Sequence, residues 1–310
     1  MKIFNQISAC QNLQNPVLSL GMYDGVHVGH QEIIHKLNQI AEEVGGESVL
    51  LTFEPHPRIA LNKGADELQL LTTLDEKIEL LEKAGLQNLI LHPFTYDFSE
   101  LSAYDFVRNL LVDEIGIHSI VIGYDHQFGK NRSGNFEQLN QWAQDLNFNC
   151  VKIEEIQSNG QQTSSTKIRK ALLNGDLDFA NQALGRNYAL SGEVIHGDQL
   201  GRTLGFPTAN LAIEKYKLIP QNGVYVVKAH LGKEIFKGLL SIGTRPTVTN
   251  SNEKRVEVYL LDFDREIYGK TLSIACLHKI RDDQKFDSLE LLVEQMNRDK
   301  AFAMAFDFTS

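Results

Sequence analysis

Residues 21–30 read GMYDGVHVGH, and they connect a short apolar run to a helical pattern. The run before them, residues 17–20, has the length and composition of a buried strand. After them, apolar residues recur at helical spacing, at Ile33, Ile34, Leu37 and Ile40. The segment is therefore predicted to be a strand–turn–helix junction of an α/β fold.

A helix start of this kind favours an anion. Its first backbone N–H groups have no partner within the helix, and the helix dipole adds partial positive charge. His27 and His30, three residues apart at the predicted helix start, add donors that can become cationic. We therefore predict a phosphate site here, with both histidines as catalytic candidates and with Gly21, Asp24 and Gly29 shaping the turn.

Two other interpretations of the histidines stay open. A histidine beside a turn is often a surface or capping residue, and Gly25 and Gly29 could serve only to reach positive φ. A zinc site is the second alternative, because histidine is a common ligand. The sequence shows neither a nearby pair of cysteines nor an HExxH pattern, so zinc is disfavoured.

The bulk composition favours a globular protein that acts on small molecules. With 310 residues the chain exceeds what one core usually holds, so two domains are expected. Its 42% hydrophobic and 23% charged residues are ordinary for a globular protein. The formal net charge of -10 argues against nonspecific binding to nucleic acid or to an anionic membrane.

Cysteine use and the amino terminus indicate a cytoplasmic protein. Cys10, Cys150 and Cys276 are far apart and form no CxxC pair, as expected of reduced thiols. The first sixteen residues contain no apolar core of the secretory type, and no apolar run approaches membrane-spanning length.

The first part of the chain, residues 1–183, alternates strand-like and helix-like segments, which predicts a doubly wound, Rossmann-like parallel sheet. Helices are expected over residues 72–85 and 102–115. Ligands of such folds bind beyond the carboxyl ends of the strands, where residues 21–30 fall. Strands are expected at residues 17–20, 47–53, 88–92, 119–122 and 150–153.

The second part, residues 185–310, changes to short alternating runs, which predict a small closed β barrel or a sandwich. A carboxyl-terminal helix is expected over residues 287–299. The predicted strands are residues 188–194, 224–230, 236–242, 255–263 and 272–280.

Three further motifs of the first part follow predicted strands or open a helix. TFEPHP, residues 52–57, is a turn stiffened by two prolines, and it fits a structural turn as well as the wall of a site. The loop over residues 122–134, with Asp125 and Phe128, is a ligand-loop candidate, although such a loop could also be solvated surface. SSTKIRKAL, residues 164–172, is a helix start at which the phosphates of a nucleotide could bind. Its phosphate-binding candidates are Ser164, Ser165, Thr166 and Arg169.

Two features of the second part suggest nucleotide chemistry. The segment HGDQLGRTLGFPTANL, residues 196–211, has glycines whose backbone can approach phosphates closely. If this segment is extended, Thr208 and Asn210 share one face, and their oxygens suit Mg²⁺ carried in with ATP. Glu257 lies in the strand pattern RVEVYLLDF and is either solvent-facing or a general base. Its sequence context alone favours the solvent-facing position.

Taken together, these strings resemble the prokaryotic bifunctional riboflavin kinase and FAD synthetase family over essentially the whole chain. The shared strings are GMYDGVHVGH, TFEPHP, GYDHQFG, SSTKIR, GRTLGFPTAN, GVY, IGTRPTV and IRDDQKF, in this order. The resemblance implies an amino-terminal FMN adenylyltransferase and a carboxyl-terminal β-barrel riboflavin kinase. Both halves would use ATP with Mg²⁺, and FMN and FAD would be products rather than prosthetic groups.

The same resemblance implies roles for individual residues. His27 and His30 would stabilise adenylyl transfer, and Glu257 would be the general base on the 5′ hydroxyl of riboflavin. The residues implied to hold ATP phosphates are Gly21, Asp24, Gly29, Ser164, Ser165, Thr166, Arg169, Gly201 and Arg202. Thr208 and Asn210 would hold Mg²⁺ and ATP, and the flavin would lie near Asp125, Phe128, Arg245 and Thr247.

Three positions depart from the family pattern, and two rival functions remain. Met22 and Tyr23 stand where Asn and Phe are common, and Ser241 stands where Asn often precedes the IG pair. One rival is an adenylyltransferase whose barrel only senses a ligand; the presence of Thr208, Asn210 and Glu257 counts against it. The other rival is a flavin or nucleotide carrier, which would need neither the HxGH pair nor a base.

Overall fold

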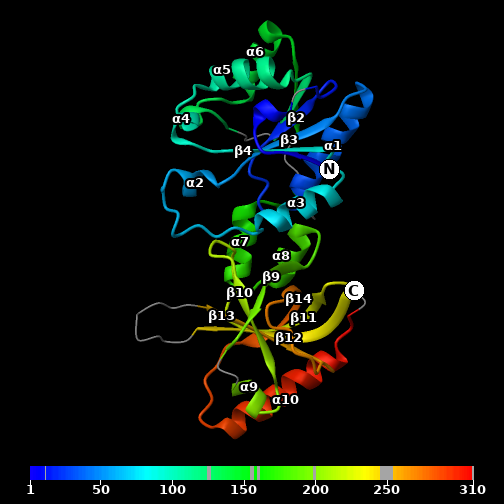
Figure 1. The fold of residues 1–310 in the computed structure, drawn as a ribbon, viewed down its shortest axis with the longest axis vertical. Coiled ribbons are helices and arrows are strands. Elements are labelled where there is room, and N and C mark those ends of the chain that lie inside the picture. The colour runs from blue at the N-terminus through cyan, green and yellow to red at the C-terminus, as the bar shows by residue number, and fades with distance from the viewer. Residues whose placement is uncertain are drawn as a thin grey trace. The chain divides into compact units, whose positions relative to one another are not determined.

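The computed structural model describes residues 1–10, 12–123, 127–153, 157–158, 161–197, 200–244 and 254–308. The chain forms two compact units, Met1–Ser164 and Ser165–Ser310 (Figure 1). Among the described residues, no helix combines the length and apolar composition that crossing a membrane requires.

The first unit is built on a six-stranded parallel sheet of order β1-β4-β3-β2-β5-β6. Its strands are β1 Lys2–Phe4, β2 Val17–Leu20, β3 Ser48–Phe53, β4 Asn88–His92, β5 Ser119–Gly123 and β6 Asn149–Ile153. The five predicted strands are confirmed. Strand β1 was not predicted, because its three residues are largely exposed and show no apolar alternation.

Helices cover both faces of this sheet because alternate strand residues face opposite layers. Leu50 and Leu89 pack in a core with Leu37 of α1 and Leu81 of α3, whereas Val49 and Leu51 face the opposite core. The longer helices are α1 Val28–Glu43, α3 Leu74–Lys83, the π-helix η2 Phe106–Ile115 and α6 Phe136–Leu146. Short helical turns are η1 Ile7–Ala9, α2 Pro57–Ala60, α4 Tyr96–Ser99, α5 Ala103–Asp105 and η3 Lys130–Arg132.

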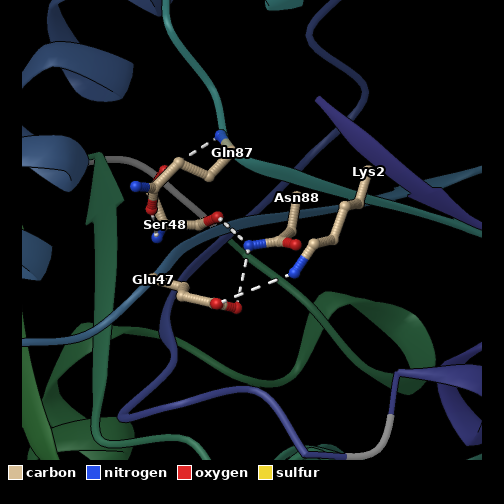
Figure 2. A network of polar contacts seen from close by, with 5 residues as sticks. All are labelled: Lys2, Glu47, Ser48, Gln87 and Asn88. Atoms are coloured by element: carbon tan, nitrogen blue, oxygen red, sulfur yellow. Dashed lines mark hydrogen bonds and ion pairs between the residues drawn. The ribbon is translucent and has the colours of Figure 1, made fainter.

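A polar network joins the amino-terminal ends of three neighbouring strands of this sheet (Figure 2). The Asn88 side chain, 1% exposed, donates from Nδ2 to Ser48 O and to Glu47 Oε2 at 3.2 and 3.3 Å. Gln87 Oε1 accepts from Ser48 N at 2.7 Å, and Lys2 Nζ lies 3.8 Å from Glu47 Oε1. These contacts connect the starts of β1, β3 and β4.

The second unit contains a closed barrel of order β10-β13-β12-β11-β14-β9, in which β9 also pairs with β10. The strands are β9 Tyr188–Ile195, β10 Thr208–Ile213, β11 Gly223–Leu231, β12 Glu234–Thr244, β13 Lys254–Leu260 and β14 Thr271–Asp282. The predicted barrel is confirmed. A small hairpin, β7 Gln157–Ser158 with β8 Gln161–Gln162, belongs to the first unit.

The helices of the second unit, within its described residues, are α7 Ser165–Leu173, α8 Leu177–Leu184, α9 Leu200–Thr203 and α10 Leu289–Ala305. Figure 1 shows α10 running alongside the barrel, and its Ala303 packs in one core with Val226 and Leu239 of the barrel wall. Helix α10 continues to Ala305, six residues past the predicted end at Asp299, because Ala303 is buried in this contact.

Candidate active sites

In the first unit, two histidine rings stack at the start of α1. His27 is the N-cap residue, and its Nδ1 accepts a hydrogen bond from the backbone N–H of His30 at 3.3 Å. The ring centroids lie 3.6 Å apart with an interplanar angle of 17°. His27 is 6% exposed and largely shielded from water, whereas His30 is half-buried. The predicted helix start is confirmed.

Neighbouring residues fix the orientation of this pair. A Cβ at Gly29 would lie 3.2 Å from Cε1 and Nδ1 of His27, so glycine leaves the room that the ring occupies. Tyr23 stacks on His30 with centroids 4.6 Å apart, and its hydroxyl lies 2.8 Å from Ser19 Oγ. Burial raises the pKa of Tyr23 above its ordinary value. Ser19 thus accommodates the hydroxyl that distinguishes Tyr23 from the phenylalanine common in the family.

Hydrogen bonds to the carboxylate of Asp24 connect the loop over residues 21–30 to the segment before α3. Asp24 Oδ1 accepts from Leu71 N at 2.9 Å, from Thr72 N at 3.1 Å and from Thr72 Oγ1 at 3.2 Å. The loop holds Tyr23 and Val26 at φ of 49° and 36°, in a region that side chains with a Cβ rarely adopt. Asp24 therefore orders the loop, and its contact with ATP phosphates stays a prediction.

In the second unit, three adjacent strands bring Asn210, Glu257 and Ser241 side by side. Asn210 of β10 is paired with Glu257 of β13, and Glu257 is paired with Ser241 of β12. All three line a cavity of about 440 Å³, together with Thr208. Glu257 thus faces a cavity, which favours the general-base interpretation over the solvent-facing one.

A second cavity, of about 360 Å³, lies beside the first. Its walls include Val194, Ala209 and Val258 from the barrel strands and Tyr268 from the segment after β13. Thr208 lines both cavities. The two cavities therefore adjoin at this residue.

Comparison with known proteins identifies the family. Models of two protein families match the chain, FAD synthetase over residues 9–167 and riboflavin kinase over residues 184–306. The bifunctional riboflavin kinase/FMN adenylyltransferase of Listeria monocytogenes is 40% identical over 292 residues, 94% of this chain and 92% of that protein. Its Bacillus subtilis counterpart is 36% identical over 294 residues, with the same coverage of both chains.

The chain belongs to the bifunctional riboflavin kinase/FMN adenylyltransferase family. It has both activities and produces FMN and FAD with ATP. A solved structure described as a macrolide-efflux protein from Streptococcus pneumoniae is 30% identical, with a TM-score of 0.89. That likeness covers 98% of this chain and 99% of the other.

The remaining phosphate-binding candidates lie at the starts of two helices, α7 and α9. Ser165, Thr166 and Arg169 occupy the first turns of α7, as predicted, and Ser164 precedes them. In the kinase unit the carbonyl of Gly201 accepts from the N–H groups of Leu204 and Phe206. Binding of ATP by these residues, and by the Gly21 backbone, stays a prediction. Four predicted site residues lie outside what the structure describes, Arg202 by its side chain and Asp125, Arg245 and Thr247 entirely.

An aromatic cluster that we did not predict lies at the carboxyl ends of β3 and β4. The ring of Phe98 packs against Phe53, Phe94 and Phe106, with centroids 5.2 to 5.8 Å apart. Phe106 also contacts the predicted flavin residue Phe128, at 6.0 Å. The signal was present in the sequence, because an aromatic residue ends β3 and another closely follows β4.

A buried ion pair was also missed. Asp299 of α10 is 4% exposed and accepts from Arg281 Nη2 at 2.8 Å and from Arg281 Nε at 3.1 Å. Both residues line the 440 Å³ cavity. The pair therefore fixes α10 against β14 at the wall of the kinase cavity.

Proposed function

We propose that adenylyl transfer takes place at His27 and His30, and that riboflavin is phosphorylated in the cavity containing Glu257. The catalytic regions would be residues 1–183 for the adenylyltransferase and 185–310 for the kinase. The two family models, which match residues 9–167 and 184–306, support this division.

The stacked histidine pair supports the assignment of adenylyl transfer. Because His27 Nδ1 accepts a hydrogen bond, the neutral ring carries its proton on Nε2, which is the donor of this ring. Donors at the start of α1 would stabilise charge on the α-phosphate of ATP while the phosphate of FMN attacks and pyrophosphate leaves. The half-buried rings of Phe53, Phe94 and Phe98 offer aromatic surfaces for the isoalloxazine ring of FMN.

The kinase assignment is carried by one observation, that Thr208 lines both cavities. Riboflavin would occupy the cavity of about 440 Å³ and ATP that of about 360 Å³, so that the two substrates meet at Thr208. Glu257 would accept the proton of the ribityl 5′ hydroxyl as that oxygen attacks the γ-phosphate.

The oxygens of Thr208 and Asn210 fit Mg²⁺, a hard cation that usually binds few protein groups and several phosphate oxygens. Both residues line the cavity of Glu257, which supports the proposal that they hold the ion there. Bound with ATP, Mg²⁺ would offset the charge on the transferring phosphoryl group.

The test compares two variants of the full chain, each incubated with riboflavin, ATP and Mg²⁺, with the flavins separated by chromatography. The double variant His27→Ala/His30→Ala should still make FMN but lose FAD, since one transition-state donor contributes on the order of a hundredfold to a thousandfold in rate. Glu257→Gln should lose kinase turnover by about a hundredfold or more and still adenylylate supplied FMN. Normal FAD synthesis by the double histidine variant, or normal kinase turnover by folded Glu257→Gln, would refute the corresponding assignment.

A further inference from the structure

Asp299 is a buried carboxylate in α10, and donors from two side chains hold it in place. Nε and Nη2 of Arg281 on β14 donate to it at 3.1 and 2.8 Å, and Gln295 Nε2, one turn earlier in α10, donates to Oδ1 at 2.9 Å. Only 4% of Asp299 and 19% of the Arg281 side chain are exposed. A guanidinium that binds both oxygens of a carboxylate fixes the distance and the angle between the two elements.

The ion pair lies between two parts of α10 that pack differently. After it, Ala303 is buried in the core that α10 shares with the barrel. Before it, residues 289–298 are all described and none of them is buried, and in this part Leu292 and Met296 line the cavity of about 440 Å³. Residues 292, 296, 299 and 303 follow one another at helical spacing, so Asp299 stands in the stripe that faces the barrel. The amino-terminal half of α10 therefore borders the cavity without a buried residue of its own.

Arg281 also contacts the segment that connects β14 to α10. Its Nη1 donates to the carbonyl of Asp282 at 3.1 Å, and its guanidinium lies 5.8 Å from the centre of the Phe286 ring. Phe286 lines the same cavity. One guanidinium therefore contacts two walls of the cavity, the helix and the segment before it.

A buried ion pair is a weak source of stability. Taking two charges out of water costs about as much free energy as their attraction returns, and apolar side chains of similar volume often replace such a pair without loss of stability. Apolar side chains cannot reproduce the fixed geometry of a guanidinium on a carboxylate. The contact between Arg281 and Asp299 therefore suits positioning better than stabilisation.

We propose that Arg281 and Asp299 are positioning residues of the kinase unit, whose ion pair holds the amino-terminal half of α10 where Leu292 and Met296 pack against riboflavin. The inference rests on the proposed place of riboflavin in the cavity of about 440 Å³. Neither residue of the pair takes part in phosphoryl transfer. Losing the contact therefore weakens riboflavin binding and leaves the chemical step intact.

The first test alters the geometry of the pair and keeps its charge. Arg281→Lys in the full chain should raise the KM for riboflavin by about fivefold or more, because one ammonium cannot bind both carboxylate oxygens as the guanidinium does. The kcat of phosphorylation and the KM for ATP should change by less than about twofold, and FMN adenylylation should not change.

The matched control is Arg298→Lys, the same substitution one residue before Asp299. The Arg298 side chain is 68% exposed in its ion pair with Glu294, so this variant should change the KM for riboflavin by less than about twofold. An unchanged KM for riboflavin in Arg281→Lys, or an equal rise in both variants, would overturn the proposal.

A second pair of variants separates positioning from stability. Arg281→Met alone should lower the melting temperature, because it leaves a buried carboxylate without its cation. Arg281→Met/Asp299→Leu removes both charges and should melt close to the unaltered chain, but its KM for riboflavin should remain raised by about fivefold or more. Recovery of both the melting temperature and the KM would overturn the proposal, since the pair would then act through stability alone. If the double variant does not fold, Arg281→Lys decides.

Leu292→Ala distinguishes a failure of this role from a failure of the proposed function. It shortens a side chain that lines the cavity and leaves both residues of the ion pair in place. If Leu292→Ala keeps the KM for riboflavin, riboflavin does not occupy this cavity, and the role of the pair fails with the proposed function. If Leu292→Ala raises the KM while Arg281→Lys does not, only the role of the ion pair fails.

Discussion

Gly29 lies between the two histidines because the ring of His27 fills the space in which a side chain would stand. We predict that Gly29→Ala moves this ring, since its Cβ would lie 3.2 Å from two ring atoms. FAD formation should fall by about tenfold to a hundredfold while α1 remains folded. The measurement is FMN adenylylation, with circular dichroism as the check on folding.

Gly201 provides the matched control in the other unit. A Cβ there would lie 2.3 Å from the carbonyl oxygen of Phe206, so Gly201→Ala should displace the loop that leads to Thr208. This variant should lose riboflavin phosphorylation and keep FMN adenylylation, the reverse of Gly29→Ala. Equal loss of both activities in either variant would mean that the substitution acts through general unfolding.

At the residue scale, candidate site residues could be predicted from the sequence where their positions depend on local spacing. His27 and His30 could be predicted because both belong to one helix start, and Thr208 and Asn210 because alternation puts them on one face of β10. The burial of Lys77 in the first turn of α3 could not be predicted, since a lysine in an amphipathic helix pattern is normally exposed, whereas this one is 6% exposed. The orientation of Glu257 was likewise decided only by its neighbours across two strands.

At the scale of the elements, the amino ends of β3 and β4 depend on the Asn88 amide shown in Figure 2. We predict that Asn88→Asp lowers the free energy of unfolding of the first unit by about 3 kcal/mol or more. The change replaces a donor by a carboxylate oxygen that faces Glu47 Oε2 and Ser48 O. Thermal or urea unfolding of the full chain measures the loss.

The free energy of unfolding of Asn88→Asp should depend on pH in a definite direction. Burial beside Glu47 raises the pKa of the new carboxyl group in the folded state, so the folded state binds more protons than the unfolded one. The destabilisation should therefore shrink as the pH falls. Asn149→Asp is the control, because Asn149 is exposed and its amide donates to His118 O at 3.5 Å. A similar loss in both variants would contradict a special role for the Asn88 network.

The elements that were predicted are those with a strong local pattern. Buried parallel strands such as β3 and β4 are continuous apolar runs, and the Ser102 cap marks the start of α5. Helix α6 was missed although Asn135 and Gln138 form a capping box, since no element was predicted between the ligand loop over residues 122–134 and the strand over residues 150–153. The π-helical geometry of η2 leaves no mark in the spacing of its apolar residues, so the sequence predicted only a helix there.

At the scale of the whole molecule, the chain forms two compact units. Helix α8 is part of the second unit, which contains the barrel. Asn181 of α8 donates from Nδ2 to Cys276 O of β14 at 3.0 Å, and its Oδ1 accepts from Tyr188 N of β9 at 2.7 Å. Leu177 and Leu184 of the same helix are buried. The change near Gly185 to short alternating apolar runs thus marks the start of the barrel strands. The second compact unit begins twenty residues earlier, at Ser165.

Two fragments of the kinase unit, one starting at residue 165 and one at residue 185, test which start gives the more stable unit. Residues 165–310 and residues 185–310 both contain Thr208, Asn210 and Glu257, so both should phosphorylate riboflavin when folded. The shorter fragment lacks α7 and α8, and with α8 it loses two buried leucines and the hydrogen bonds of Asn181. We predict that its free energy of unfolding is lower by about 3 kcal/mol or more.

Urea unfolding and riboflavin phosphorylation of the two fragments, measured at several temperatures, provide the comparison. The longer fragment should match the kinase activity of the full chain, and the activity of the shorter one should disappear at a lower temperature, where its structure melts. Because both carry the same catalytic residues, their rates should agree below that temperature. Equal stability would show that α7 and α8 contribute nothing to the barrel. A folded longer fragment without kinase activity would show that phosphorylation depends on residues of the first unit.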